Sequence, residues 1–143
     1  MSSLDKHFHK AYEFFKKVAI ELGLPAEEKD KALYFFRVVV HPFRDRLSPE
    51  EVVDVISELP VLVKGLFVEG WKTARKPVKR YHKLNDFWVD IMHRSMGQIN
   101  STEEAERVAR AVLGVIRHHV SPGEWNDVVK VMPEEISKFL RSI

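Results

Sequence analysis

The chain has 143 residues, of which 45% are hydrophobic and 31% are charged, and it carries a formal net charge of +2 and no cysteine. This length predicts one domain, and the hydrophobic fraction is enough to fill a core, so we expect a folded protein rather than a disordered one. The absence of cysteine excludes disulfides, thiolate nucleophiles and cysteine-ligated metals, and is typical of a reducing cytoplasm.

Targeting signals are not apparent in the sequence. The first ten residues have neither an apolar signal core nor an arginine-rich transit pattern, so we expect no export. The longest uninterrupted apolar runs, such as residues 38–40, are far shorter than the ~20 residues that a membrane helix needs. We therefore expect a cytoplasmic protein that makes no contact with a membrane.

Apolar residues recur every three or four positions along most of the chain, whereas strand-like alternation is absent, and this pattern predicts an all-α fold. The first helix is expected from about Leu4 to Leu22, where Gly23 is placed to end it. Its inner stripe is predicted to consist of Leu4, Phe8, Ala11, Phe15, Val18 and Leu22. A second helix is expected from about Ala26 to Leu47.

Three sequences of the capping type mark further helix starts, because serine can accept a hydrogen bond from the backbone N–H three residues on. They lie at residues 48–51, 101–104 and 121–124. Residues 61–67, after Pro60, either continue a kinked helix or open another short one. Residues 71–84 lose the helical periodicity and form a predicted connector, and the helical pattern returns from Asn85 to Met96.

The chain contains an internal repeat. Residues 31–67 align without a gap with residues 104–140, and ten of the 37 pairs are identical. The identical pairs are Ala32/Ala105, Arg37/Arg110, Val39/Val112, Arg44/Arg117, Ser48/Ser121, Pro49/Pro122, Glu51/Glu124, Asp54/Asp127, Val55/Val128 and Pro60/Pro133. This predicts a single domain, residues 1–143, built as a helical bundle of two tandem repeats of three to four helices stacked on a shared core, about 4–70 and 85–143.

The two copies differ in their last helix. Val61 and Leu62 align with Glu134 and Glu135, so the first terminal helix is expected to be buried on more sides than the second. Two explanations of its apolar surface stay open, namely stacking between the repeats and contact with a partner or a second copy of the chain. The candidate interaction surface consists of Val61, Leu62, Val68 and Trp71.

One family shares these features. Residues 43–51, Phe-Arg-Asp-Arg-Leu-Ser-Pro-Glu-Glu, followed by Leu59-Pro60 and by residues 65–71, Gly-Leu-Phe-Val-Glu-Gly-Trp, resemble the bacterial family known as domain of unknown function 2267. Residues 109–113 and 121–124 are similar to its second repeat. The resemblance implies a two-repeat helical domain, and it implies no reaction, cofactor or catalytic residue.

Catalytic and metal-binding patterns are weak. The adjacent glutamates at 50–51, 103–104 and 134–135 all fall in predicted first turns, where negative charge stabilises a helix. His7 and His9 diverge on a helix, residues 118–119 are neighbouring histidines, and only Asp90 with His93 has the spacing of a helical ligand pair. Phosphate-binding glycine loops and nucleophile elbows are missing. We expect no metal, no cofactor and no catalytic residue. A metal-dependent or small-molecule enzyme in the crevice between the repeats stays open as a third alternative, because the chain has seven histidines.

The connector concentrates positive charge. Its cations are Lys72, Arg75, Lys76, Lys79, Arg80 and Lys83, and without them the formal net charge falls from +2 to −4. With the aromatic residues Trp71 and Tyr81 between or beside these cations, the segment is a candidate site for weak, sequence-independent nucleic-acid binding, unless it is only a solvated linker. The leading expectation is a non-catalytic helical protein-interaction module, with self-association as one form of that interaction.

Overall fold

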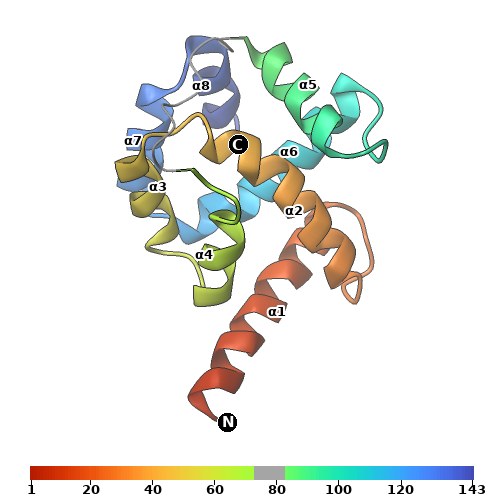
Figure 1. Cartoon of the computed structure of the whole chain (residues 1–143), viewed down its shortest axis with the longest axis vertical. Helices are drawn as coiled ribbons and strands as arrows, with labels where there is room; N and C mark the ends of the chain where they lie inside the picture. Colours follow the sequence, from red (N-terminus) through yellow and green to blue (C-terminus); the bar gives the residue numbers. More distant parts are fainter. Residues whose placement is uncertain (73–82) are drawn as a thin grey trace.

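The computed structural model describes residues 1–72 and 83–143, and within these ranges it contains eight helices and no strand. In chain order they are α1 (Ser3–Glu21), α2 (Lys29–Arg44), α3 (Pro49–Ile56), α4 (Val61–Phe67), α5 (Leu84–Arg94), α6 (Thr102–His119), α7 (Pro122–Val131) and α8 (Glu134–Arg141) (Figure 1). The all-α prediction is confirmed, and Pro60 opens a separate short helix.

Local sequence fixes the helix ends as expected. The Oγ atoms of Ser48, Ser101 and Ser121 each accept a hydrogen bond from the backbone N–H three residues later, at 3.3, 3.1 and 3.3 Å. These bonds satisfy N–H groups that have no partner within the helix. Gly23, which follows the end of α1, has a φ of 78°. Glycine adopts this left-handed conformation with little steric strain, so the chain can turn away from the helix here.

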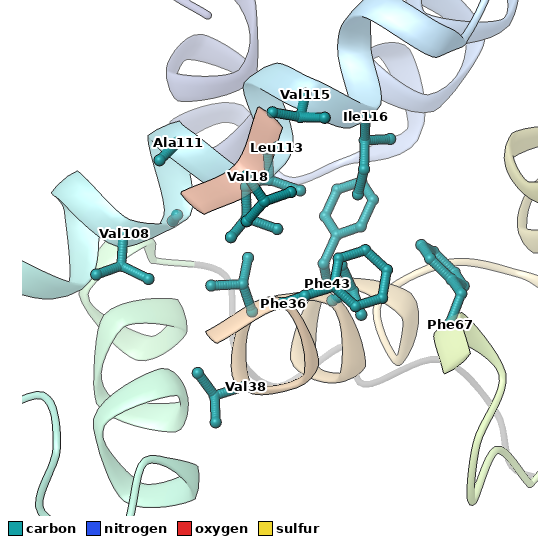
Figure 2. Packing of buried hydrophobic residues seen from close by; sticks show 14 of the residues in the cluster. Val18, Phe36, Val38, Phe43, Phe67, Val108, Ala111, Leu113, Val115 and Ile116 are labelled. Atoms are coloured by element: carbon teal, nitrogen blue, oxygen red, sulfur yellow. The ribbon is translucent and has the colours of Figure 1, made fainter. Parts of the chain in front are cut away.

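The core lies where α2 and α6 pack against each other near the centre of the molecule (Figure 1). Phe36 and Phe43 of α2 and Leu113 and Ile116 of α6 are completely buried, and Figure 2 shows them converging with side chains of neighbouring helices. Around this centre, α3 packs on α7, α1 packs on α6 and α5 packs on α2. Helices far apart in the sequence therefore share one hydrophobic core.

The first turns of α1 depart from the sequence prediction. Leu4 and Phe8 belong to the stripe expected to face inward, but their side chains are 63% and 42% exposed. Figure 1 shows the N-terminal turns of α1 extending past the other helices. The apolar stripe of α1 is longer than the part of the helix that other helices cover. Its buried residues begin at Ala11.

The prediction for the two terminal helices was wrong. In α4 only Val63 and Phe67 are buried, and Val61 is 51% exposed. In α8 four residues are buried, namely Ile136, Ser137, Phe139 and Leu140. Glu134 and Glu135 occupy the exposed first turn of α8, where their negative charges interact favourably with the helix dipole. They leave the apolar face of α8 free to pack on the core.

Candidate interaction surface

Three large exposed side chains follow one another at four-residue intervals on α1. Leu4, Phe8 and Tyr12 are 63%, 42% and 55% exposed, and the ring centroids of Phe8 and Tyr12 are 6.5 Å apart. Residues four apart lie on the same side of a helix, so the three form one continuous strip, which we call the α1 ridge. The helical pattern in the sequence assigned Leu4 and Phe8 to the core, and it did not single out Tyr12.

The ridge stands on a firmly anchored helix. At its free end, Ser2 and Asp5 form a reciprocal capping box, with the Ser2 Oγ accepting from the Asp5 N–H at 3.1 Å. At its other end, the buried rings of Phe14 and Phe15 meet Phe36 of α2 edge to face, at centroid distances of 5.7 and 5.3 Å. Both ends favour a formed helix, so the ridge is presented without a folding cost at contact.

The surface proposed from sequence is only partly open. Of its four residues, Val61 is exposed, whereas Leu62, Val68 and Trp71 are half-buried. Val68 and Trp71 pack against the hydrophobic core, and the Trp71 N–H donates to the Val68 carbonyl oxygen at 3.0 Å. Intramolecular packing therefore accounts for most of this apolar surface, and Val61 is its one exposed member.

A groove of about 360 Å³ runs along a different side of α1. Its lining includes His9, Glu13 and Lys17 of α1, together with Glu58 and Pro60 at the turn between α3 and α4. Glu13 and Lys17 lie on the far side of the helix from Phe8, and His9 lies about a quarter of a turn from it, given 3.6 residues per turn. The Glu58 carboxylate accepts a hydrogen bond from the Ser121 N–H at 2.8 Å, so it serves to fix the start of α7.

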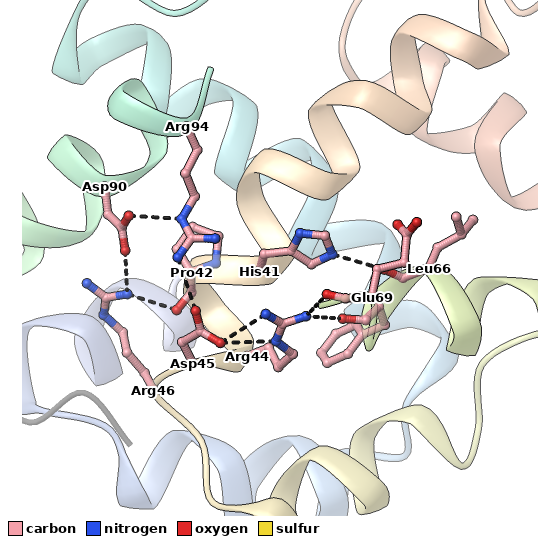
Figure 3. A network of polar contacts seen from close by, with 10 residues as sticks. His41, Pro42, Arg44, Asp45, Arg46, Leu66, Glu69, Asp90 and Arg94 are labelled. Carbon is pink, nitrogen blue, oxygen red and sulfur yellow. Dashed lines mark hydrogen bonds and ion pairs between the residues drawn. The ribbon is translucent and has the colours of Figure 1, made fainter. Parts of the chain in front are cut away.

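Beneath the surface, ionic contacts join the end of α2 to α5 (Figure 3). The side chain of Arg46 is only 2% exposed, and its Nη1 lies 3.3 Å from a carboxylate oxygen of Asp90 and 2.8 Å from the Pro42 carbonyl oxygen. Arg94 then bonds to Asp90 at 3.0 Å and to Asp45 at 3.1 Å. Burial lowers the pKa of Arg46, and Asp90 opposes this effect by stabilising the charged form.

The same cluster reaches the end of α4. Arg44 donates through Nη1 to the carbonyl oxygens of Phe67 and Glu69, at 3.1 and 2.6 Å. Nearby, Nε2 of His41 lies 3.0 Å from the Leu66 carbonyl oxygen, and burial lowers the pKa of this imidazole despite that contact. These bonds satisfy carbonyl groups at the end of α4 and hold that helix against α2.

The sequence pattern did not predict that Arg44 and Arg46 are buried. Arg44 and Arg46 are 4% and 7% exposed, although charged residues at a helix end are ordinarily solvated. Arg46 also lies over the ring of Phe87, at 5.2 Å from its centroid. For Arg44, the sequence signal was its identity with Arg117 in the internal repeat. The Arg117 guanidinium lies 5.8 Å from the centroid of the Trp125 ring.

Two groups of candidates from the sequence remain, namely the possible metal-ligand pair Asp90 and His93 and the basic residues of the connector. Asp90, which has metal-ligand spacing with His93, is bonded to Arg46 and Arg94, and the residues that the structure describes contain no group of three or more side chains able to hold a metal ion. Lys72 and Lys83 are exposed. The other four basic candidates, Arg75, Lys76, Lys79 and Arg80, lie outside the described residues.

Together these features define an all-helical protein. Ion pairs join the end of α2 to α5, and hydrogen bonds from Arg44 join it to the end of α4. A strip of apolar side chains, the α1 ridge, projects from α1. None of the helices in residues 1–72 and 83–143 is long and apolar enough to cross a bilayer. The chain belongs to the family described as "Uncharacterized conserved protein (DUF2267)", whose model matches residues 11–139. No curated protein was found to match the chain. Leu4 and Phe8 precede the matched range.

Proposed function

We propose that this protein is a non-catalytic, cytoplasmic protein-interaction module that makes contact through the α1 ridge. One observation carries the proposal: Leu4, Phe8 and Tyr12 stand exposed in a row on an anchored helix. Contiguous apolar surface of this kind marks interaction sites in folded proteins. The exposed Val61 of α4, a helix that packs against α1, is a second point of contact in keeping with the surface expected from sequence.

The size of the ridge predicts a reversible contact. Fully burying a large apolar side chain contributes about 1.5–3 kcal/mol, so burying three half-exposed ones contributes about 3 kcal/mol from one side of an interface. This is well below the roughly 8 kcal/mol of a micromolar complex. The protein is thus expected to bind weakly unless the partner contributes an apolar surface of its own.

We also infer that the fold consists of two copies of one helical unit. Arg37 of α2 bonds to Glu69, just after α4, and Arg110 of α6 bonds to Ser142, just after α8. The two residues of each pair are 32 positions apart. Arg110 lies 73 positions after Arg37, and Ser142 lies 73 positions after Glu69, which is the offset of the internal repeat. The reciprocal packing of α1 on α6 and α5 on α2, with α2 on α6 and α3 on α7, is what a pseudo-twofold axis between the copies requires.

A capture experiment tests the interaction proposal. The wild-type chain and the variant Phe8→Ser are immobilised and exposed to native lysate, with Ile20→Ser as the control because Ile20 is a similarly exposed residue of the same helix, 53% accessible. We expect Phe8→Ser to lose the proteins that the wild type and the control retain. Retention of the same set by all three baits would contradict the proposed surface.

The basic connector supports a second candidate function, weak binding of nucleic acid. Six cations fall between residues 72 and 83 with no acidic residue among them, and aromatic residues adjoin them. Lysine and arginine attract phosphates regardless of sequence, and aromatic rings stack on bases. This candidate depends on sequence alone, so it ranks below the interaction module.

A further inference from the structure

We propose that Arg117 is the centre of a binding site for a small organic anion, one that carries a carboxylate or a phosphate group, in a hollow at the end of α6. The inference goes beyond the proposed function, because it concerns a small molecule and a hollow that no residue of the α1 ridge lines. It is argued from positions that the internal repeat aligns, 73 residues apart.

The hollow has a volume of about 360 Å³ and lies between the end of α6, the start of α7 and the segment after α8. It is lined by Gly114, Arg117, His118, Val120, Pro122 and Ile143. Small-molecule sites have volumes of this order, and they combine apolar side chains with a few polar groups, as this lining does. The lining contains a guanidinium and an imidazole and no aspartate or glutamate, so its local charge favours an anion.

Arg44 is the equivalent of Arg117 in the first copy, and the protein itself occupies all three of its guanidinium nitrogens (Figure 3). Its Nε and Nη2 each lie 3.1 Å from Oδ1 of Asp45. Its Nη1 donates to the carbonyl oxygens of Phe67 and Glu69. In the first copy, therefore, the adjacent carboxylate of Asp45 neutralises the arginine.

Arg117 has no such neighbour, because the position equivalent to Asp45 is His118. In the part of the chain that the structure describes, Arg117 forms neither an ion pair nor a hydrogen bond. Its guanidinium lies against the ring of Trp125, at 5.8 Å from the centroid. Its N–H donors are thus available to an anion in the hollow, and such an anion would take the place that the Asp45 carboxylate has beside Arg44.

Gly114 keeps the hollow open, although no structural requirement for glycine is evident at this position. It lies within α6, where glycine is less favourable than alanine, and its equivalent in the first copy is His41. Its φ is not positive, and a Cβ atom here would meet Cγ2 of Ile143 at 3.8 Å, an ordinary van der Waals contact. Gly114 thus lowers helix stability and leaves the space beside Arg117 accessible to a ligand.

Nuclear magnetic resonance of the full chain tests the site, with inorganic phosphate and benzoate as the two probes. We expect saturable shifts of backbone amide signals, centred on residues 114–122, with at least one of the probes. Arg117→Gln is expected to weaken binding by about tenfold or more, because it removes hydrogen bonds to a charged group. The control is Arg107→Gln, which replaces an arginine of the same helix that is 63% exposed and outside the hollow, and it should leave binding unchanged.

A second variant tests the comparison between the copies. His118→Asp places a carboxylate beside Arg117, as in the first copy, and is expected to weaken binding more than the neutral variant His118→Asn does. Equal effects of the two would contradict that comparison and overturn the proposal. Shifts that survive Arg117→Gln, or no saturable shift with either probe, would also overturn the site. None of these results bears on the capture experiment at the α1 ridge, and the amide spectrum verifies that each variant is folded.

Discussion

Arg46 and Asp90 form an ion pair at 3.3 Å although 44 residues separate them, and the side chain of Arg46 is almost completely buried. The pair joins the segment after α2 to α5, across the two halves of the chain. A buried charge without its counterion costs several kcal/mol, because it loses its hydration and the protein interior stabilises charge less than water does. Asp90 supplies that counterion, and we therefore expect the pair to favour this one placement of the segment after α2 against α5.

Replacing Asp90 is expected to destabilise the fold strongly. Asp90→Ala removes the carboxylate that lies 3.3 Å from the buried Arg46 and that also bonds to Arg94, and we expect the free energy of unfolding to fall by about 3 kcal/mol. The control is Glu106→Ala, which removes an exposed ion pair to Arg110 at 4.0 Å and should cost less than about 1 kcal/mol. Urea unfolding measures both, and equal losses would contradict the structural role of the Arg46–Asp90 pair.

Two glutamates at equivalent helix positions are expected to respond in opposite directions. Glu51 accepts the Ser48 N–H at 2.8 Å, so Glu51→Gln weakens a charged acceptor and should lower the urea midpoint. Glu124 lies near Asp54, Asp127 and Glu58, and loss of hydration together with these like charges raises its pKa above the ordinary value of 4.5. Glu124→Gln should therefore raise the midpoint at pH 7.

The sign of this effect also predicts its pH dependence. A carboxyl group with a raised pKa binds its proton more tightly in the folded state, so its contribution to stability decreases as pH rises from about 4.5. The advantage of Glu124→Gln should be full at pH 7 and should disappear below pH 4. An advantage that persists at low pH would mean that charge is not the cause.

The serine caps give a third prediction. Ser48→Ala and Ser121→Ala each remove the acceptor for a backbone N–H, and each should cost about 1 kcal/mol. Thermal or urea unfolding measures the loss. Ser57→Ala serves as a comparison, because the Ser57 Oγ only donates to the Asp54 carbonyl oxygen near the end of α3. Unchanged stability in both cap variants would refute this account of how α3 and α7 begin.

The connector prediction concerns nucleic acid. Fluorescence anisotropy with a labelled duplex and a labelled single strand should show affinity that falls linearly with the logarithm of salt concentration. Replacing the six cations of residues 72–83 by glutamine should abolish binding and leave stability within about 0.5 kcal/mol. Binding that survives the six substitutions would locate the site elsewhere, and no binding at low salt would leave the segment as a linker.

Local signals in the sequence predicted the helices because they act over a few residues. Serine caps, the glycine after α1 and the prolines before α4 and α8 specify helix ends through backbone hydrogen bonds and allowed φ values, which need no knowledge of the rest of the fold. The family resemblance was confirmed by a family model that matches residues 11–139.

Burial of particular side chains could not be predicted so well. Periodicity identifies the apolar side of α1, but it contains no information about how far the other helices reach, and Leu4 and Phe8 were therefore assigned to the core. Arg46 was missed because its burial depends on Asp90 and Phe87, which only the tertiary fold brings to it. Both failures concern contacts between segments distant in the sequence.

The most direct test of the central claim is the set of proteins that the full chain captures from native lysate, identified by mass spectrometry for the wild type and for variants of the α1 ridge. The account predicts partners that the wild type retains, that Phe8→Glu loses and that Ile20→Glu keeps. A wild-type chain that retains no protein would contradict the interaction module. Partners lost by Val61→Glu and kept by Phe8→Glu would contradict the α1 ridge and place the contact on α4.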